Sequence, residues 1–217
     1  MMPAKPDERQ YRMMAVPLIA PQGAERPANR FESEFYVEGY ASTFDDPYTL
    51  FEDEDGWRYV EIVEPTAFAN ADMSDVIMQY DHDGQVYARQ SNGTLVVEPD
   101  AHGLFVAADL SRTTLSRQMW EQVESGLVTR MSWAFTIADE TVERDEANKV
   151  LTSRITAVRK VFDVSAVSRP ADPNTAISAR ALFDGEIEAR RLRESERRGR
   201  SRLLMEMRAR TIDMERH

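Results

Sequence analysis

The chain has 217 residues, a formal net charge of −11 at pH 7 and no cysteine. Such an acidic chain is unsuited to nucleic acid, whose phosphates need a basic face, and the lack of cysteine excludes disulfides, thiolate metal sites and a cysteine nucleophile. With 42% hydrophobic residues and no apolar stretch near the roughly 18 residues of a membrane span, we expect a globular chain made in the cytoplasm.

The N-terminal 30 residues differ in composition from the rest. They contain five of the ten prolines, and their one apolar run is short, from Ala15 to Ala20. This pattern predicts a mostly irregular N-terminal arm over residues 1–30. Residues 31–180 are expected to form the single folded domain, which is an ordinary size for one core.

The start of this domain is rich in strand-forming residues. The segment from Phe35 to Phe44 predicts a first core strand, and the segment from Trp57 to Val63 predicts a second. Between them, the acidic and turn-rich residues 45–56 predict a solvated loop rather than an ion site. Residues 64–68 predict a strand end that runs into a short helix.

The middle of the domain gives two more sheet segments and a helix. Residues 76–80 fit a short buried strand, which places His82 at a strand-to-turn edge. Residues 94–110 predict a hairpin with His102 in its turn. Apolar residues recur at a spacing of four from Leu115 to Leu127, which predicts an amphipathic helix. A Ser/Thr-rich segment marks its start, and Gly126 marks its end.

A period-two pattern follows this helix. Met131, Trp133 and Phe135 alternate with smaller residues, so a half-buried strand is predicted, with Ser132 pointing away from the core where a polypeptide could reach it. A hairpin that turns near residues 145–148 is expected to return as a strand up to Val167. On that return strand, alternation places four residues on one face: Val161, Asp163, Ser165 and Val167.

The C-terminal segment, residues 181–217, is predicted to be a charged helical tail. Residues 184–217 hold eight acidic residues and ten arginines, whereas the rest of the chain is strongly acidic. Leu203, Leu204 and Met207 recur at helical spacing and give the helix a narrow apolar stripe.

Only a few side chains could carry acid–base or nucleophilic chemistry. Of the three imidazoles, His102 is a turn residue and His217 is the last residue, which leaves His82 as the best base by position. A serine nucleophile needs such a base near neutral pH, and the base needs an acceptor that orients it.

Six short motifs, taken in order over about residues 35–180, resemble the prohead maturation proteases of tailed phages. They are Gly39-Tyr40-Ala41 with Phe44, Val63-Glu64-Pro65 with Ala67-Phe68, Asp81-His82-Asp83, Gly103-Leu104, Ser132-Trp133-Ala134-Phe135, and Asp163-Val164-Ser165-Ala166-Val167 with Pro170-Ala171. That family is in turn similar to the herpesvirus assemblin serine proteases.

The resemblance implies an α+β, mainly β fold, with an assemblin-like β-barrel surrounded by helices. It implies Ser132 as nucleophile, His82 as general base and Asp163 as the acid that orients the histidine, with the backbone around Ser168 and Arg169 binding the oxyanion. Asp163 stands where the family commonly has Glu, and it is shorter by one C–C bond of about 1.5 Å. Asp81 likewise replaces the usual Asn.

The function implied by the resemblance is a serine endopeptidase without a cofactor. It would cleave the major capsid protein, the scaffold segment of that protein and itself, inside the prohead that assembles in the host cytoplasm. The arm (1–30) would be cleaved, and the tail (181–217) would dock on capsid protein or be removed by self-cleavage. The chain could form a homo-oligomer. Nucleic acid and membrane are not expected partners.

Other interpretations stay open from the residues alone. Ser132 and His82 could be ordinary strand-edge and turn residues, Asp81-His82-Asp83 could belong to a metal site, and Asp163 could be structural, with Ser165 taking its place. At the level of function, the alternatives are a non-enzymatic capsid-assembly scaffold module derived from such a protease and a small-molecule-binding barrel.

Overall fold

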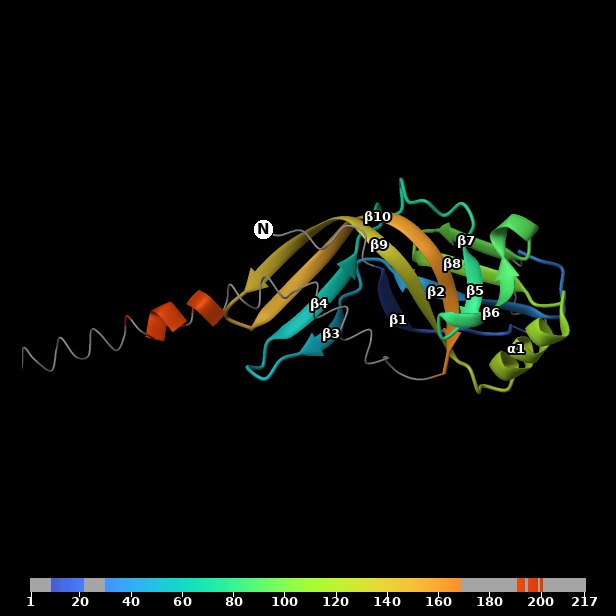
Figure 1. Ribbon diagram of the computed structural model, residues 1–217, viewed down its shortest axis with the longest axis horizontal. Coiled ribbons are helices and arrows are strands. Elements are labelled where there is room, and N and C mark those ends of the chain that lie inside the picture. Colours follow the sequence, from blue (N-terminus) through green and yellow to red (C-terminus); the bar gives the residue numbers. More distant parts are fainter. Residues whose placement is uncertain (1–8, 22–29, 169–190, 194, 199, 201–217) are drawn as a thin grey trace, which may run out of the picture.

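The computed structural model describes residues 9–21, 30–168, 191–193, 195–198 and 200. These residues form two β-sheets with one α-helix packed against them (Figure 1). The elements in chain order are β1 (Gln10–Pro17), β2 (Tyr36–Thr43), β3 (Tyr48–Glu52), β4 (Arg58–Val63), β5 (Ile77–Tyr80), β6 (Asp83–Arg89), the 3-10 turn η2 (Gln90–Asn92), β7 (Leu95–Pro99), β8 (Gly103–Asp109), α1 (Thr114–Glu124), β9 (Arg130–Asp145) and β10 (Val150–Val167).

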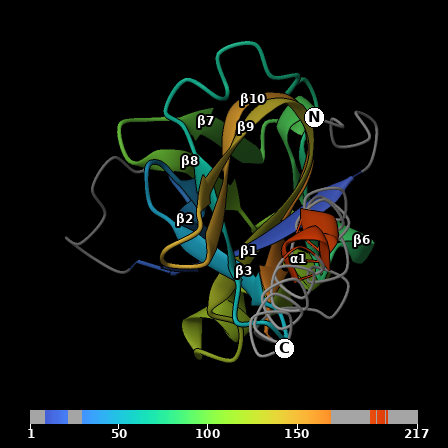
Figure 2. The same ribbon diagram turned by 90° about the vertical axis from the view of Figure 1, so that its left-hand side faces the viewer.

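The antiparallel hairpin of β9 and β10 contains the two longest strands among the described residues. Its strands have 16 and 18 residues, and Figure 2 shows the hairpin as an arch. On its other edge β10 pairs in parallel with β4 and then, further along, with β5. The resulting seven-stranded sheet has the order β1-β9-β10-β4-β3, with β5 and β6 attached through β10, and β2, β8 and β7 form a separate sheet.

The core follows from the alternation of side chains along these strands. Met131, Trp133 and Phe135 of β9 are fully buried on one face, and the rings of Trp133 and Phe135 stack with centroids 3.7 Å apart. A second, smaller cluster of Trp57, Tyr59 and Leu151 lies where β4 meets the tip of the hairpin. Burial on this scale stabilises a domain by about 25 cal/mol per Å² of apolar surface removed from water.

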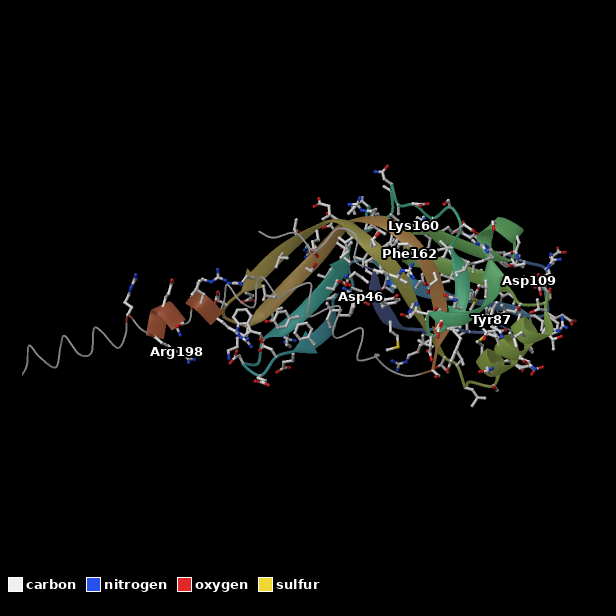
Figure 3. All side chains as sticks on the ribbon, in the orientation of Figure 1. Asp46, Tyr87, Asp109, Lys160, Phe162 and Arg198 are labelled. Carbon is white, nitrogen blue, oxygen red and sulfur yellow. The ribbon has the colours of Figure 1, made fainter. Side chains whose placement is uncertain are left out.

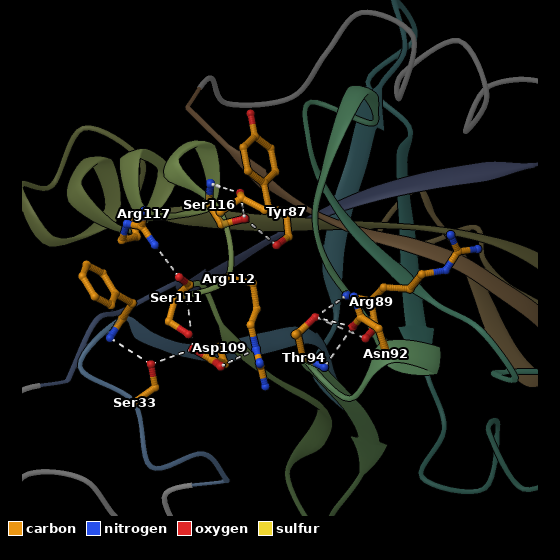
Figure 4. Close-up of polar contacts among 12 residues, drawn as sticks. Ser33, Tyr87, Arg89, Asn92, Thr94, Asp109, Ser111, Arg112, Ser116 and Arg117 are labelled. Atoms are coloured by element: carbon orange, nitrogen blue, oxygen red, sulfur yellow. Dashed lines mark hydrogen bonds and ion pairs between the residues drawn. The ribbon is translucent and has the colours of Figure 1, made fainter.

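Helix α1 begins at a capped N-terminus and packs its apolar face inward. The Thr113 side chain accepts a hydrogen bond from the Ser116 N–H, as in an N-cap, and Met119 and Val123 are buried. The Ser116 hydroxyl also donates to the Tyr87 carbonyl of β6 at 2.8 Å (Figure 4). The helix therefore holds the strand that follows the His82 turn.

Most of the predicted elements are confirmed. The strands predicted at 35–44, 57–63 and 76–80 correspond to β2, β4 and β5, and the hairpin at 94–110 corresponds to β7 and β8. The predicted helix is α1, and the long hairpin after it is β9 and β10, which turns at residues 146–149. In each case the hydrophobic period identified the element.

Three predictions from local composition were wrong. Within the arm, which was expected to be mostly irregular, residues 10–17 form β1, because their backbone pairs with β9. The acidic stretch 45–56, expected to be a loop, contains β3, which pairs with β4. Residues 64–68, expected to run into a helix, instead begin a series of turns. The Ala67 N–H donates to the Glu64 carbonyl, and the Ala69 N–H donates to the Thr66 carbonyl.

The face predicted for Val161 was also wrong. A bulge between Val161 and Asp163 inserts one extra residue in β10, so Val161 joins Val164 in the main core instead of sharing the face of Asp163. The extra residue, Phe162, is half-buried, with the Lys160 ammonium 5.7 Å from its ring centroid (Figure 3).

The mainly β, α+β class is confirmed, but within the described residues the two sheets do not close into one barrel. The sheets pack against each other in one core, but no strand of one forms a ladder with a strand of the other, and β3, β6 and β7 each pair with one strand only. An isolated bridge between Ile19 and Glu38 links the segment after β1 to β2. The helices expected around the sheets are represented in residues 9–168 by α1 and the short turn η2.

Of the predicted tail, residues 191–193, 195–198 and 200 are helical, and Leu203, Leu204 and Met207 lie outside the described residues. Among the residues that are described, no helix has the length and apolar character needed to cross a bilayer.

Gly103 permits the close approach of β2 and β8. A Cβ built on it would lie 2.0 Å from the Ser42 carbonyl oxygen, a backbone atom. We predict that Gly103→Ala lowers the free energy of unfolding by about 3 kcal/mol, because the backbones must separate. Urea denaturation measures this loss, and the exposed neighbour Ala101 provides a control, since Ala101→Ser should change stability by less than about 0.5 kcal/mol.

Candidate active site

His82 lies in the tight turn between β5 and β6. Both Asp81 (φ 47°) and His82 (φ 60°) have left-handed backbone conformations, and the turn is closed by the pairing of Tyr80 with Asp83. Two-residue hairpin turns of this kind usually hold Asn or Gly. A histidine kept in such a conformation is strained, which is common at functional sites.

Hydrogen bonds to β10 hold this turn in place. The Asp81 N–H donates to the Ala166 carbonyl at 3.1 Å, and the His82 N–H donates to the Ser165 hydroxyl at 3.1 Å. Because β5 runs parallel to β10 up to this point, the turn reaches the sheet beside residues 163–166.

The register of β9 and β10 places two more polar residues next to this histidine. Ser132 lies opposite Ser165, and Asp163 lies opposite Ala134. Directly opposed residues of antiparallel strands point to the same face. The side chains of Ser132, Ser165 and Asp163 therefore share the face that the imidazole of His82 covers.

The three predicted catalytic residues form one hydrogen-bonded line. His82 Nδ1 lies 2.5 Å from Asp163 Oδ1, and His82 Nε2 lies 2.6 Å from Ser132 Oγ. A carboxylate can only accept, so Nδ1 carries the hydrogen and Nε2 is free to accept from the serine hydroxyl. Asp163 Oδ1 also accepts from the Ser165 hydroxyl at 3.0 Å.

The line is largely shielded from solvent. Ser132 is 3% exposed, Asp163 2%, and the His82 side chain 15%. Electrostatic interactions between such groups are stronger than in water. Ser132 does point away from the face of Met131 and Trp133, but the expectation that it is openly accessible was wrong, because β1 runs along β9 and His82 lies over the hydroxyl.

Strand β1 contributes contacts that were missed from sequence. The ring of Tyr11 packs edge-on against His82 with centroids 4.8 Å apart, and the Arg12 carbonyl lies 2.9 Å from Ser132 Oγ. The proline content of residues 1–30 hid this strand, and its alternating apolar and polar pattern is too weak to have revealed it.

The other residues named from sequence lie as follows. His102 is in the β7–β8 turn, where its ring packs against Tyr40 at 4.5 Å. The Ser168 hydroxyl is 2.6 Å from the Tyr80 hydroxyl. Arg169 and His217 lie outside the described residues. Within the described part, no group of three or more His, Asp or Glu side chains is arranged to hold a metal ion.

The chain was compared with known protein families. The caudovirus prohead serine protease family matches residues 23–188, which is most of the chain and includes Ser132, His82 and Asp163. The chain belongs to this family. No match was found among curated proteins or among solved structures.

Membership of the prohead serine protease family supports a serine protease that acts in bacteriophage capsid maturation. It also confirms the resemblance seen in the six motifs, and it places the action inside the capsid that assembles in the host cytoplasm. The family match assigns no catalytic residues, so the roles of Ser132, His82 and Asp163 remain predictions, argued from the geometry described above.

Ser165 supports both Asp163 and the His82 turn. We predict that Ser165→Ala lowers the free energy of unfolding by about 1–3 kcal/mol, because a buried N–H and a buried carboxylate each lose a partner. Urea denaturation compares it with Ser42→Ala, a control that is equally buried but whose hydroxyl makes one long contact, 3.3 Å, to the Thr43 carbonyl. Equal losses for both variants would contradict this role of Ser165.

Proposed function

We propose that the chain is a serine endopeptidase of prohead maturation, in which Ser132 is the nucleophile, His82 the general base and Asp163 the orienting acid. The observation that carries the proposal is the hydrogen-bonded line from Asp163 Oδ1 through His82 to Ser132 Oγ, with distances of 2.5 and 2.6 Å. A nucleophile, a base and an acceptor in contact, in this order, are what acyl transfer by a serine requires.

The mechanism follows from the tautomer that Asp163 selects. His82 Nε2 takes the Ser132 proton as Oγ attacks the scissile carbonyl, and Asp163 stabilises the imidazolium that forms. The imidazolium then donates this proton to the leaving amine, which gives an acyl-enzyme. Water, activated by His82 in the same way, releases the acid product and restores the serine.

The short side chain of Asp163 fits this role because of the sheet. The parallel pairing of β5 with β10 sets Ile77 beside Asp163 and Tyr80 beside Ala166, so the turn that follows delivers the imidazole close to the strand. An aspartate then reaches the histidine where a longer glutamate is common in the family.

The oxyanion would be bound by backbone N–H groups around Ser168 and Arg169. Ser168 directly follows β10, three residues beyond Ser165, the residue that faces Ser132. Preorganised donors at this position would stabilise the charge that develops on the carbonyl oxygen.

The proposed substrates are the major capsid protein, its scaffold segment and the chain itself, with the tail (181–217) as a docking or self-cleaved segment. The arm (1–30) is a further candidate for self-cleavage. Because β1 is part of the site, a cut before Gln10 is compatible with activity, whereas a cut after Pro17 would remove the Arg12 carbonyl. Homo-oligomers and kinship with the assemblins, including a barrel, belong to the same proposal.

The second candidate is a scaffold module without enzyme activity. The low exposure of Ser132, 3%, favours it, since an open site would be more accessible to a polypeptide. The two functions differ in whether peptide bonds are cut.

Co-expression of the chain with its capsid protein separates the two. We predict that the wild type yields shortened capsid protein, detected by intact mass spectrometry, and that Ser132→Ala yields full-length products only, because the attacking oxygen is missing. Identical full-length masses for both chains, under conditions in which shells assemble, would leave the scaffold module as the function.

The orienting acid is tested by Asp163→Asn. The amide donates as well as accepts, so it can favour the wrong histidine tautomer, and we predict a fall in cleavage rate of roughly 10³–10⁴-fold with the fold retained. Quantified product formation over time measures this rate. Asp139→Asn, an exposed change on β9, should cleave at the wild-type rate, and an equal rate for Asp163→Asn would remove Asp163 from the mechanism.

A further inference from the structure

Arg12 is a fully buried cation on an edge strand. Its side chain is 0% exposed, although β1 has β9 as its only ladder partner among the described strands. Arg12 Nε and Nη2 donate to Oε1 and Oε2 of Glu61 on β4, at 2.8 and 2.7 Å, and Glu61 is equally buried. Arginine is rarely buried so completely unless its N–H groups are paired.

The rest of the guanidinium is paired as well. Nη1 donates to the Tyr11 carbonyl at 2.9 Å, and both Nη atoms contact Gln10 Oε1 at 3.4 Å. The Tyr48 hydroxyl of β3 donates to Glu61 Oε1. Burial alone would lower the pKa of Arg12, but the charge of Glu61 and the hydrogen bonds of the cluster raise it above its ordinary value, so Arg12 stays charged.

This cluster fixes the backbone of β1 relative to the sheet. The Arg12 guanidinium donates to Glu61 on β4 and also to the Tyr11 carbonyl of its own strand. Bidentate pairs of this kind restrict orientation as well as distance. The Arg12 side chain lies toward the core, where its Cζ is 5.6 Å from the Phe135 ring centroid, while its carbonyl meets Ser132.

The Ser132 hydroxyl thus lies between two acceptors, His82 Nε2 at 2.6 Å and the Arg12 carbonyl at 2.9 Å. A hydroxyl carries one hydrogen and can donate to one acceptor at a time. Whenever Nε2 itself holds a hydrogen and donates it to Oγ, the serine hydrogen needs the Arg12 carbonyl. The carbonyl therefore keeps Oγ within reach of His82 in both states.

We propose that Arg12 is a positioning residue for Ser132, because the buried Arg12–Glu61 ion pair fixes the Arg12 carbonyl as the second acceptor of the Ser132 hydroxyl. This inference rests on the proposed function, since it presumes that Ser132 is the nucleophile. It adds this pair, which joins β1 to β4, to the groups that set the reactivity of the serine.

The test separates positioning from simple stability. Glu61→Gln alone leaves a buried cation unpaired and should lower the thermal unfolding midpoint strongly, whereas Arg12→Met with Glu61→Met removes both charges and should restore most of it. The readout is covalent labelling of full-length protein by a fluorophosphonate, in which Ser132 Oγ bonds to phosphorus, fluoride leaves and the serine proton passes to His82 Nε2. Intact mass spectrometry follows the adduct at several probe concentrations.

For the folded double variant we expect a limiting labelling rate about ten-fold below the wild type, with an unchanged probe concentration at half-maximal rate. This split would not follow from a role in stability alone. A double variant that recovers the unfolding midpoint and labels at the wild-type rate would overturn the proposal.

Arg12→Lys keeps the proposal testable if the double variant does not fold. Lysine retains the charge but cannot form the bidentate pair or also reach the Tyr11 carbonyl. Tryptophan fluorescence gives the unfolding midpoint of Arg12→Lys, and the variant is labelled below that temperature. Its limiting labelling rate should also be reduced, and a wild-type rate would overturn the proposal. If the wild type itself is not labelled, or Ser132→Ala is labelled equally, the proposed function has failed instead.

Discussion

Strand β10 is hydrogen-bonded along both edges, and the candidate site depends on that pairing. One edge takes β9, which brings Ser132 opposite Ser165, and the other takes β5, which ends beside Ala166. Because one strand sets both registers, Ser132 and the His82 turn reach the same place from opposite sides of β10. A slip of one residue on either edge would turn the side chains to the other face and separate them.

The bulge in β10 lets one strand serve the core and the site. Before it, Val161 is part of the core, and after it Asp163 and Ser165 point to the face of Ser132. The extra residue therefore moves the polar pair to the site face. Rigid strands hold such a constellation more closely than loops do, which suits a reaction that tolerates little displacement.

The left-handed turn at His82 destabilises the folded chain, unlike the strand pairing. Two consecutive non-glycine residues in that region cost on the order of 1–3 kcal/mol each, and the bonds to Ala166 and Ser165 offset part of that cost. The buried Arg12–Glu61 pair has a similar character, since desolvation of two charges is compensated only by their close contact. The conformational cost of the site is thus met by contacts with strands that are distant in sequence.

Sequence reasoning succeeded where a local period determines the structure. The alternation at Met131, Trp133 and Phe135 and the spacing of four in α1 both gave the right elements. Motif order gave the grouping of Ser132, His82 and Asp163, which the structure brings into contact.

Sequence reasoning failed where the structure of a segment depends on a strand that is distant in sequence. Strand β1 exists because β9 pairs with it, and the proline-rich composition of residues 1–30 indicated the opposite. Because β1 was not predicted, the contacts of Tyr11, Arg12 and Glu61 were missed and Ser132 was wrongly expected to be accessible. Nothing local in a sequence shows which strand will cover a serine. The bulge at Phe162 was missed for the same reason, since alternation alone assumes a continuous ladder.

The central claim is that Asp163, His82 and Ser132 form one hydrogen-bonded line with the hydrogen on His82 Nδ1. Proton NMR of the folded chain at low temperature tests it most directly, because a hydrogen in a short, shielded N–H···O bond resonates far downfield of amide and indole protons. The wild type is expected to show one such resonance, which is kept in His102→Gln and lost in Asp163→Asn. Its absence from the wild type, or its persistence in Asp163→Asn, would contradict the account.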